Sequence, residues 1–244
     1  MARLVLLGTG TCQLDDGLVA SSVLVELDGL RLIFDCGRGV AARLAELGYR
    51  QDQVCHVVVS HFHADHVSDL VPLMQAGSWS QTDPRGRDLH IWGPPGLRRL
   101  VEGWLELFGA TSLVNPDRYG VELHELPAGP FTIDCRQLEL VSLPPAGNHG
   151  LGFAVDGKRY ALTGDSSFHQ EEIDFLRDRE LAVIDSGHLS EEEIVDLAAR
   201  TQVRRLVCSH LYRPLDAGAL NTRAAKAGHT GELIVGEDRM IFGL

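Results

Sequence analysis

Apolar runs of strand length, separated by glycine-rich turns, form the first part of the chain. Arg3–Leu7 is apolar and ends at Gly8-Thr9-Gly10-Thr11, and two further runs, Ser22–Leu27 and Leu30–Phe34, flank the turn Asp28-Gly29. An Asp-Gly turn between two such runs is typical of a β-hairpin. The pattern therefore predicts that the chain begins with antiparallel strands.

An alternation of helices and strands follows this hairpin. Apolar side chains recur at helical spacing between Gly39 and Gly48, which predicts a helix. The continuous apolar run Val54–Val59 predicts a strand that is covered on both faces. A histidine-rich segment comes directly after this strand, and a further helix is predicted to begin near Val67.

The same alternation continues to the end of the chain. Helices are predicted at Leu97–Phe108 and at Glu191–Arg200, the second with Ser190 as its N-cap. Strands are predicted at Leu89–Trp92, Val121–Leu126, Phe131–Leu143, Phe153–Val155, Arg159–Leu162, Leu181–Ile184 and Arg204–Cys208, and a β-rich tail begins at Glu232.

Antiparallel strands followed by alternating strands and helices occur in both halves of the sequence. This order predicts an α/β fold of two sheets packed together with helices outside. The length of 244 residues fits one sizeable domain, so residues 1–244 are expected to form a single domain. The segment Gly77–Asp88 is polar and turn-rich, and we expect it to be a mobile loop near the site.

Composition narrows the class of protein. Hydrophobic residues make up 44% of the chain and charged residues 23%, which is enough for a packed core. The formal net charge of −12 argues against extended, sequence-independent binding of nucleic acid, which requires a basic surface. It does not exclude a phosphate substrate, because bound metal ions supply local positive charge.

Cysteine usage and hydropathy indicate the compartment. The five cysteines contain no C-x-x-C pair and lie in or beside apolar runs, so we expect buried free thiols in a reducing environment. The apolar run at the N-terminus is too short for a signal peptide, and no stretch reaches membrane-spanning length. The expectation is a soluble cytoplasmic protein that does not bind membranes.

The run His61-Phe62-His63-Ala64-Asp65-His66 carries the strongest chemical signal in the sequence. It places four potential metal ligands within six residues, and imidazole and carboxylate are ligands for zinc and similar divalent ions. On an irregular loop, alternate side chains can converge on one ion while Asp65 and His66 turn to a second. The run therefore predicts a metal site after the Val54–Val59 strand.

Three other residues have the chemistry to complete this site. His149 follows a predicted strand and a Pro-Pro-Ala-Gly-Asn loop, Asp165 ends the segment Thr163-Gly164-Asp165, and His210 lies just past Arg204–Cys208. Each follows a strand end, where the loops of one sheet edge gather into a site. A carboxylate such as Asp165 can also bridge two ions.

The ordered set of these ligands resembles the metallo-β-lactamase superfamily over nearly the whole chain. Gly8-Thr9-Gly10 after the first strand and Phe34-Asp35-Cys36-Gly37 before the first helix belong to the same resemblance. Within the superfamily the chain is similar to the ribonuclease Z-like phosphodiesterase branch. The resemblance implies a four-layer αββα sandwich of two mixed β-sheets flanked by helices, with the site at one edge.

The resemblance also implies a role for each ligand. His61, His63, His149 and Asp165 are expected to bind one metal ion, and Asp65, His66, Asp165 and His210 the other. Asp35 is expected to orient the metal-binding loop through hydrogen bonds. His188, in Asp185-Ser186-Gly187-His188, is expected to face the scissile phosphate. A histidine there can donate a proton to the leaving oxygen or stabilise developing negative charge. Asp65 is expected to hold the nucleophile or take its proton.

These residues predict an enzyme, a dinuclear metal-dependent hydrolase that uses a metal-bridging hydroxide. The short connection between His149 and Asp165 leaves no room for the long arm common in transfer-RNA-processing ribonuclease Z. We therefore expect a phosphodiesterase that acts on a small or cyclic phosphodiester. The alternatives are an arylsulfatase, an ester or lactone hydrolase, a ribonuclease Z-type RNA endonuclease, and a non-catalytic metal-binding accessory protein.

The expected cofactors are two divalent metal ions. Zn²⁺ fits the ligand set best, with Mn²⁺ and iron as alternatives. The expected partner is a small-molecule phosphodiester substrate. Oligomeric state is left open, with a homodimer as the commonest state among soluble oligomers.

Overall fold

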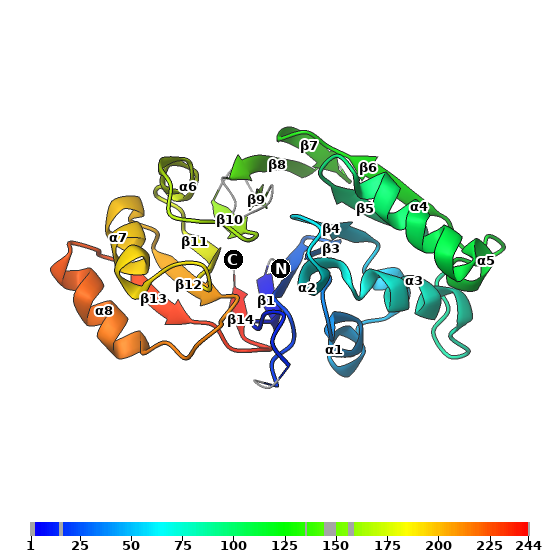
Figure 1. Cartoon of the computed structure of the whole chain (residues 1–244), viewed down its shortest axis with the longest axis horizontal. Coiled ribbons are helices and arrows are strands. Elements are labelled where there is room, and N and C mark those ends of the chain that lie inside the picture. The colour runs from blue at the N-terminus through cyan, green and yellow to red at the C-terminus, as the bar shows by residue number, and fades with distance from the viewer. Residues whose placement is uncertain (1–2, 15–16, 135, 144–149, 156–158, 244) are drawn as a thin grey trace. The chain divides into compact units, whose positions relative to one another are not determined.

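The computed structural model describes residues 3–14, 17–134, 136–143, 150–155 and 159–243 (Figure 1). The chain forms two compact units. Unit 1 comprises residues 1–8, 17–127 and 238–244, and unit 2 comprises residues 9–16 and 128–237. Each unit is built on its own β-sheet.

Unit 1 contains a seven-stranded sheet with the strand order β14-β1-β2-β3-β4-β5-β6. Neighbours from β14 to β3 pair antiparallel, as the Asp28-Gly29 turn predicts for β2 and β3. Neighbours from β3 to β6 pair parallel, so the sheet is mixed. The strands are β1 (Arg3–Gly8), β2 (Ser22–Leu27), β3 (Leu30–Phe34), β4 (His56–Val58), β5 (Leu89–Gly93), β6 (Val121–Glu125) and β14 (Ile241–Gly243).

Helices connect the parallel strands of unit 1 and share an apolar core with the sheet. They are α1 (Val40–Glu46), the 3₁₀ turn η1 (Gln51–Gln53), α2 (Ala64–Val67), α3 (Leu70–Trp79), α4 (Leu97–Phe108) and α5 (Ala110–Leu113). Alternate strand residues such as Val57 and Ile91 are buried in one cluster with Leu44 of α1, Met74 of α3 and Val101 of α4. This packing holds the strand ends of unit 1 in fixed positions.

Unit 2 contains a second seven-stranded sheet with the order β13-β12-β11-β10-β9-β8-β7. Neighbours from β7 to β10 pair antiparallel and those from β10 to β13 pair parallel. The strands are β7 (Gly129–Ile133), β8 (Arg136–Leu143), β9 (Gly150–Val155), β10 (Tyr160–Thr163), β11 (Leu181–Asp185), β12 (Arg205–Ser209) and β13 (Glu232–Val235).

Three helices follow strands of this sheet and bury apolar faces with it: α6 (Gln170–Leu176), α7 (Glu191–Thr201) and α8 (Ala217–Lys226). Figure 1 shows α7 and α8 beside β11, β12 and β13, in agreement with the contacts between α7 and α8 and between α8 and β13. The helix α7 begins with a capping box, in which Ser190 Oγ accepts from Glu193 N and Ser190 N donates to the Glu193 carboxylate.

Most elements predicted from hydrophobic periodicity are present. Leu97–Phe108 is a helix with the predicted bounds, and the predicted helix near Val67 is two helices, α2 and α3. The break between them falls at Asp69, whose carboxylate accepts from the Ala41 amide while its own N–H donates to Cys36 O. The helices α6 and α8 were not predicted, since neither has a long apolar stripe.

The predicted mobile loop Gly77–Asp88 begins inside α3, which extends to Trp79. Its second half is tied to the rest of unit 1 through Arg85, which is fully buried and donates to Val54 O and to the Gln51 side chain. The amides of Gly86 and Arg87 both donate to the Asp52 carboxylate. A lid that moved as a whole would break all of these bonds.

The prediction of buried thiols is correct for Cys36, Cys55 and Cys208 and wrong for Cys12, which is exposed. Cys12 lies in the loop after β1, where the apolar run has ended, and its Sγ lies 3.5 Å from Tyr212 Oη. Cys135 lies outside the described residues.

We expect Ser190→Ala to lower the free energy of unfolding by about 1 kcal/mol, because the first turn of α7 loses its N-cap. Urea unfolding of the two purified proteins measures the difference. Thr222→Ala is the matched control: its hydroxyl donates back to Gly218 O on the exposed face of α8, so we expect less than about 0.5 kcal/mol. Equal effects of the two substitutions would contradict the capping role.

Candidate metal centre

Two parallel strands of unit 1 position the histidine run. β3 ends at Phe34 and β4 ends at Val58, and these two residues are partners across the parallel pair. Asp35 follows β3, and its amide donates to Val58 O at 2.8 Å. His61–His66 follows β4, so both loops leave the same edge of the sheet, where the carboxyl ends of parallel strands commonly form sites.

Asp35 accepts the hydrogen bonds that hold this loop. Its carboxylate is 2% exposed and accepts from Ser60 N at 2.7 Å, from Ser60 Oγ at 2.7 Å and from Nδ1 of His66 at 2.8 Å. A buried carboxylate with three donors is fixed in position, because moving it would leave buried groups unpaired. These contacts match the orienting role expected for Asp35.

The hydrogen bonds also determine which nitrogens of His61 and His66 are available to a ligand. Ser60 Oγ gives its single proton to Asp35, so it accepts the 3.0 Å bond from Nδ1 of His61. Asp35 accepts from Nδ1 of His66 in the same way. Each ring then presents the lone pair of Nε2, which is the nitrogen a metal ion would bind.

The rings of this loop converge. The His61 ring centroid lies 4.2 Å from that of His66 and 4.5 Å from that of His63. Asp65 Oδ2 lies 4.0 Å from Nε2 of His66. The structure thus brings the four residues of the predicted run together within unit 1. The Asp35 carboxylate lies behind His66, an arrangement found in many zinc sites.

Two glycines allow the site loops to approach their neighbours. A Cβ at Gly37 would lie 1.6 Å from the backbone oxygen of Asp65, and a Cβ at Gly187 would lie 2.3 Å from the backbone oxygen of His210. Both distances are far below van der Waals contact, so neither position accepts a side chain unless the backbone moves. Each glycine therefore permits the close packing of a loop against a predicted ligand.

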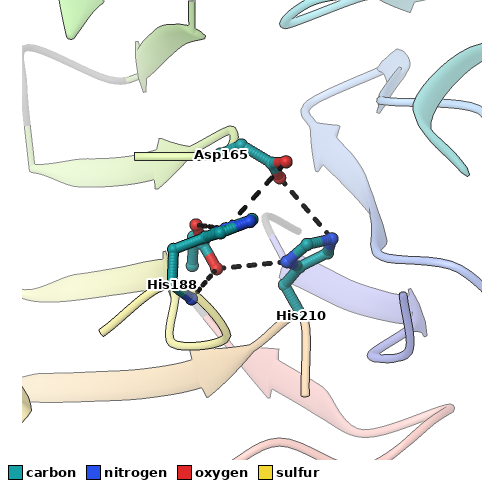
Figure 2. Close-up of side chains that lie close together, drawn as sticks. Asp165, His188 and His210 are labelled. Atoms are coloured by element: carbon teal, nitrogen blue, oxygen red, sulfur yellow. Dashed lines mark hydrogen bonds and ion pairs between the residues drawn. The ribbon is translucent and has the colours of Figure 1, made fainter. Parts of the chain in front are cut away.

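Three parallel strands of unit 2 position a second cluster. β10 ends at Thr163, β11 at Asp185 and β12 at Ser209, and the predicted residues Asp165, His188 and His210 follow them. Figure 2 shows the side chains of Asp165, His188 and His210 pointing toward one another. Asp185 accepts a hydrogen bond from each of the two histidines. The cluster can offer one ligand atom each from Asp165, Asp185, His188 and His210, all within 4.8 Å of one another.

Asp185 is the hydrogen-bonding centre of this cluster. Its Oδ2 accepts from Nδ1 of His188 at 2.7 Å and from Ser166 N at 3.0 Å, and its Oδ1 accepts from Nδ1 of His210 at 3.1 Å and from Gly187 N at 2.9 Å. Burial raises the pKa of Asp185, but the bonds from the two histidines outweigh it and the pKa is lowered. Both oxygens are occupied, so Asp185 orients ligands better than it could bind a metal ion itself.

The pair Asp165 and His210 fits a bound cation. Because His210 donates from Nδ1, its Nε2 presents a lone pair, and this nitrogen lies 3.5 Å from Asp165 Oδ1. A lone pair facing a carboxylate oxygen is repulsive, and a divalent ion bound by both atoms removes the repulsion. Histidine and aspartate are also the donors that zinc and similar ions prefer.

His188 differs from His210 in its exposure. Its side chain is 27% exposed, whereas that of His210 is 2% exposed, so His188 can meet a ligand from solvent. The hydrogen bond to Asp185 raises the pKa of His188, and partial burial only partly opposes it. Its Nδ1 also lies 4.0 Å from Asp165 Oδ2. An oriented imidazole with a raised pKa beside the carboxylate cluster can serve as a proton donor.

Sequence reasoning missed two residues of this arrangement, Ser60 and Asp185. The sequence does contain a signal for Asp185, because this residue is the last of an apolar strand. Asp35 has a similar position directly after an apolar strand. The partners of Asp185, which are His188 and His210, lie 3 and 25 positions away, and the second distance gives no local pattern. Ser60 has no distinguishing signal in the sequence.

The predicted ligand His149 lies in 144–149, outside the described residues. Other histidines of unit 1 form a ring stack on β4, β5 and β6. The Trp92 and His124 centroids lie 3.7 Å apart at 12°, and Nδ1 of His90 lies 3.1 Å from Nε2 of His124. His56 is buried beside them, with its ring stacked on His90.

Residues 15–210 match the family model described as metallo-beta-lactamase superfamily. The chain belongs to the metallo-β-lactamase superfamily. The match includes every predicted site residue from His61 to His210. The fold class predicted from the sequence, two mixed β-sheets flanked by helices, is confirmed.

Curated relatives of this superfamily member are named Ribonuclease Z. One from Mycobacterium bovis is 31% identical over 182 residues, which cover 68% of this chain and 63% of that protein. One from Mycolicibacterium gilvum is 36% identical over 108 residues, covering 44% of this chain and 38% of that protein. The chain thus spans less than two thirds of both. One from Mycobacterium avium is 26% identical over 275 residues, which cover 98% of this chain and 96% of that protein.

Solved structures share the fold. The metallo-beta-lactamase fold protein YhfI from Bacillus subtilis has a TM-score of 0.77 at 18% identity, covering 99% of this chain and 98% of that one. Human tRNase Z, short form, has a TM-score of 0.74 at 20% identity with the same coverage. The superfamily binds divalent metal ions, typically zinc, and the His and Asp clusters supply matching donors.

Among the described helices, none combines the length and apolar character needed to cross a membrane.

We expect Asp35→Asn to weaken zinc binding about 10- to 100-fold, the usual effect of losing a hydrogen-bond partner behind a ligand. The amide nitrogen of asparagine cannot accept a hydrogen bond, so it would face one of the present donors, Ser60 or His66. The His66 ring would then lose its fixed orientation. Competition with a chromogenic chelator measures the affinity.

The matched control for this substitution is Asp238→Asn. Asp238 also accepts from a backbone amide, that of Val19, and from the Arg43 guanidinium, but it touches neither Ser60 nor a histidine among the described contacts. Zinc affinity lowered equally in both variants would contradict a specific role for Asp35.

Proposed function

We propose that this protein is a metal-dependent hydrolase with a dinuclear centre that cleaves a small or cyclic phosphodiester. Three observations support the proposal: superfamily membership, the two clusters of His and Asp donors, and curated relatives whose name, Ribonuclease Z, describes cleavage of a phosphodiester. The solved structure of a diphosphatase from the PhnP family has the same fold, with a TM-score of 0.75 at 16% identity.

The proposed ligands are those that the family resemblance implies. His61, His63, His149 and Asp165 would bind one ion, and Asp65, His66, Asp165 and His210 the other. When bound, two divalent ions supply a water nucleophile that is deprotonated at neutral pH and positive charge for the phosphate oxygens. Asp65 would orient that water or accept its proton.

The observation that carries the phosphodiesterase assignment is His188 held by Asp185. The 2.7 Å bond from Nδ1 fixes the ring, and the partly exposed side chain leaves Nε2 available to a substrate. Asp185 raises the pKa of His188, which favours the protonated ring at neutral pH. The Nε2 proton can then pass to the leaving oxygen as the P–O bond breaks.

Two features favour a small substrate. The net charge of −12 disfavours the extended phosphate contacts that a long nucleic acid needs. The connection from His149 to Asp165 is also too short to include a substrate-gripping arm.

A ribonuclease Z-type endonuclease is the second candidate function. The Mycobacterium avium relative of that name matches 98% of this chain and 96% of its own length, so the two proteins align over nearly their whole lengths. Unlabelled transfer-RNA precursor tested beside cyclic nucleotides would separate the two functions. Cleavage of the precursor at lower enzyme concentration than of any small phosphodiester would favour the endonuclease.

We expect the zinc-loaded protein to hydrolyse bis(p-nitrophenyl) phosphate and His188→Ala to lower kcat about 10²-fold or more, the usual contribution of a general acid. Release of nitrophenol measures the rate. His169→Ala is the control, since His169 is an exposed histidine at the start of α6. Loss of turnover in both variants, or in neither, would refute the assigned role of His188.

We expect dialysis against a chelator to abolish turnover and two equivalents of zinc per chain to restore it. Elemental analysis of the same sample counts the ions. Substrates with aryl sulfate, lactone and thioester bonds belong in the same panel. If the fully metal-loaded protein turns over one of these substrates and no phosphodiester, that activity replaces the proposed function. If the protein binds no transition metal, an accessory protein is favoured.

A further inference from the structure

A fully buried glutamate lies behind the unit 2 cluster with no role in the function proposed so far. Glu172 is the third residue of α6 and is 0% exposed. Its neighbours on the buried side of the helix, Ile173 and Leu176, are apolar and belong to the core of unit 2. An apolar side chain would satisfy the packing at this position, so the carboxyl group requires another explanation.

Glu172 reaches the proposed metal site through one residue. Ser166 Oγ donates to Glu172 Oε1 at 2.9 Å, and Ser166 N donates to Asp185 Oδ2 at 3.0 Å. Ser166 directly follows the proposed ligand Asp165 and is itself 0% exposed. Its two donors therefore tie the Asp165 turn to α6 on one side and to the carboxylate that orients His188 and His210 on the other.

We propose that Glu172 is a positioning residue of the hydrolase site, whose buried carboxyl group fixes Ser166 and through it the carboxylates of Asp165 and Asp185. The inference rests on the proposed function, because a fixed Asp165 matters only if it binds a metal ion. Glu172 touches neither substrate nor metal in this proposal.

The cost of the carboxyl group supports a functional reason for it. Glu172 Oε2 is buried and has no hydrogen-bond partner within the described part of the chain, and an unpartnered buried polar group costs stability. Residues that lower stability yet persist in a core are expected near functional sites. A residue retained for packing alone would avoid this cost.

Glu172 performs this role as a neutral acid. Burial raises the pKa of Glu172 to about 8, with the Ser166 hydrogen bond opposing the shift and the nearby Asp185 charge adding a smaller contribution to it. At neutral pH the group is therefore mostly protonated, and no second negative charge competes with Asp185 for the protons of His188 and His210. A neutral amide of the same shape should replace it.

The test uses the full-length zinc-loaded protein with four variants. Glu172→Met removes the acceptor and keeps the volume, and Glu172→Gln keeps the acceptor as a neutral amide. Ser166→Ala removes the bridging hydroxyl. Glu171→Met changes the adjacent, exposed glutamate of α6 and is the matched control.

We expect Glu172→Met and Ser166→Ala each to lower kcat for bis(p-nitrophenyl) phosphate about 10-fold and to weaken zinc binding by a similar factor. KM should stay within about twofold, because neither residue contacts the substrate. The double variant should be no worse than either single one, since both break the same link. Glu172→Gln and Glu171→Met should retain kcat and zinc affinity within about twofold.

Thermal unfolding separates this role from a structural one. We expect the Tm of Glu172→Met to stay close to that of the wild type while its activity falls, because the apolar side chain removes the unpartnered Oε2 but also leaves the buried Ser166 hydroxyl without its acceptor, and the two changes oppose each other. Wild-type kcat and zinc affinity in Glu172→Met would overturn the inference, as would equal losses in Glu172→Gln.

If Glu172→Met does not fold, the other two variants test the inference. It then requires that Ser166→Ala lose kcat and zinc affinity and that Glu172→Gln retain both. A wild-type protein that binds no zinc and cleaves no phosphodiester defeats the proposed function, and the inference falls with it. A wild type that does both, with variants indistinguishable from it, defeats the inference alone.

Discussion

A buried carboxylate that accepts hydrogen bonds from histidine Nδ1 atoms underlies the candidate site in each unit. Asp35 holds His66 directly and His61 through Ser60, and Asp185 holds His188 and His210. Burying a carboxylate is costly, and the cost is tolerable here because each accepts at least three hydrogen bonds. The same bonds orient the imidazoles, so Nε2 of each held ring is the nitrogen available to a ligand.

The position of these carboxylates follows from the sheets. Asp35 comes directly after β3, and Asp185 is the last residue of β11. Both strands lie within parallel pairs, whose carboxyl ends meet at one edge. The next strand on that edge delivers a histidine loop to the carboxylate: β4 leads to His61–His66 and β12 leads to His210. One geometric rule therefore produces a similar cluster in both units.

The cluster in unit 2 extends into the core, and there stability and function are opposed. Ser166 joins Asp185 to Glu172, which remains buried although one of its oxygens has no partner in the described part of the chain. An apolar side chain at position 172 would satisfy the packing of the unit 2 core equally well. A folded domain keeps such a group when a precise geometry nearby depends on it.

The sequence by itself determined most of the secondary structure and the chemistry of the site. Periodicity located α4 with correct bounds and the strands that precede Asp35, His61 and His210, because burial of alternate or helical positions leaves a local pattern. The dense run from His61 to His66 identified metal-binding chemistry, because four donors in six residues rarely serve any other purpose. Family resemblance then added His188 and the role of Asp35.

Only the tertiary structure decided how these residues are held. The roles of Asp185, Ser60 and Glu172 depend on hydrogen bonds between segments up to 25 residues apart, and such bonds leave no periodic trace in a sequence. The structure also showed that Arg85 anchors a segment whose polar composition had predicted a mobile loop. Patterns along the chain reveal which side chains are buried, whereas their partners are known only once the chain has folded.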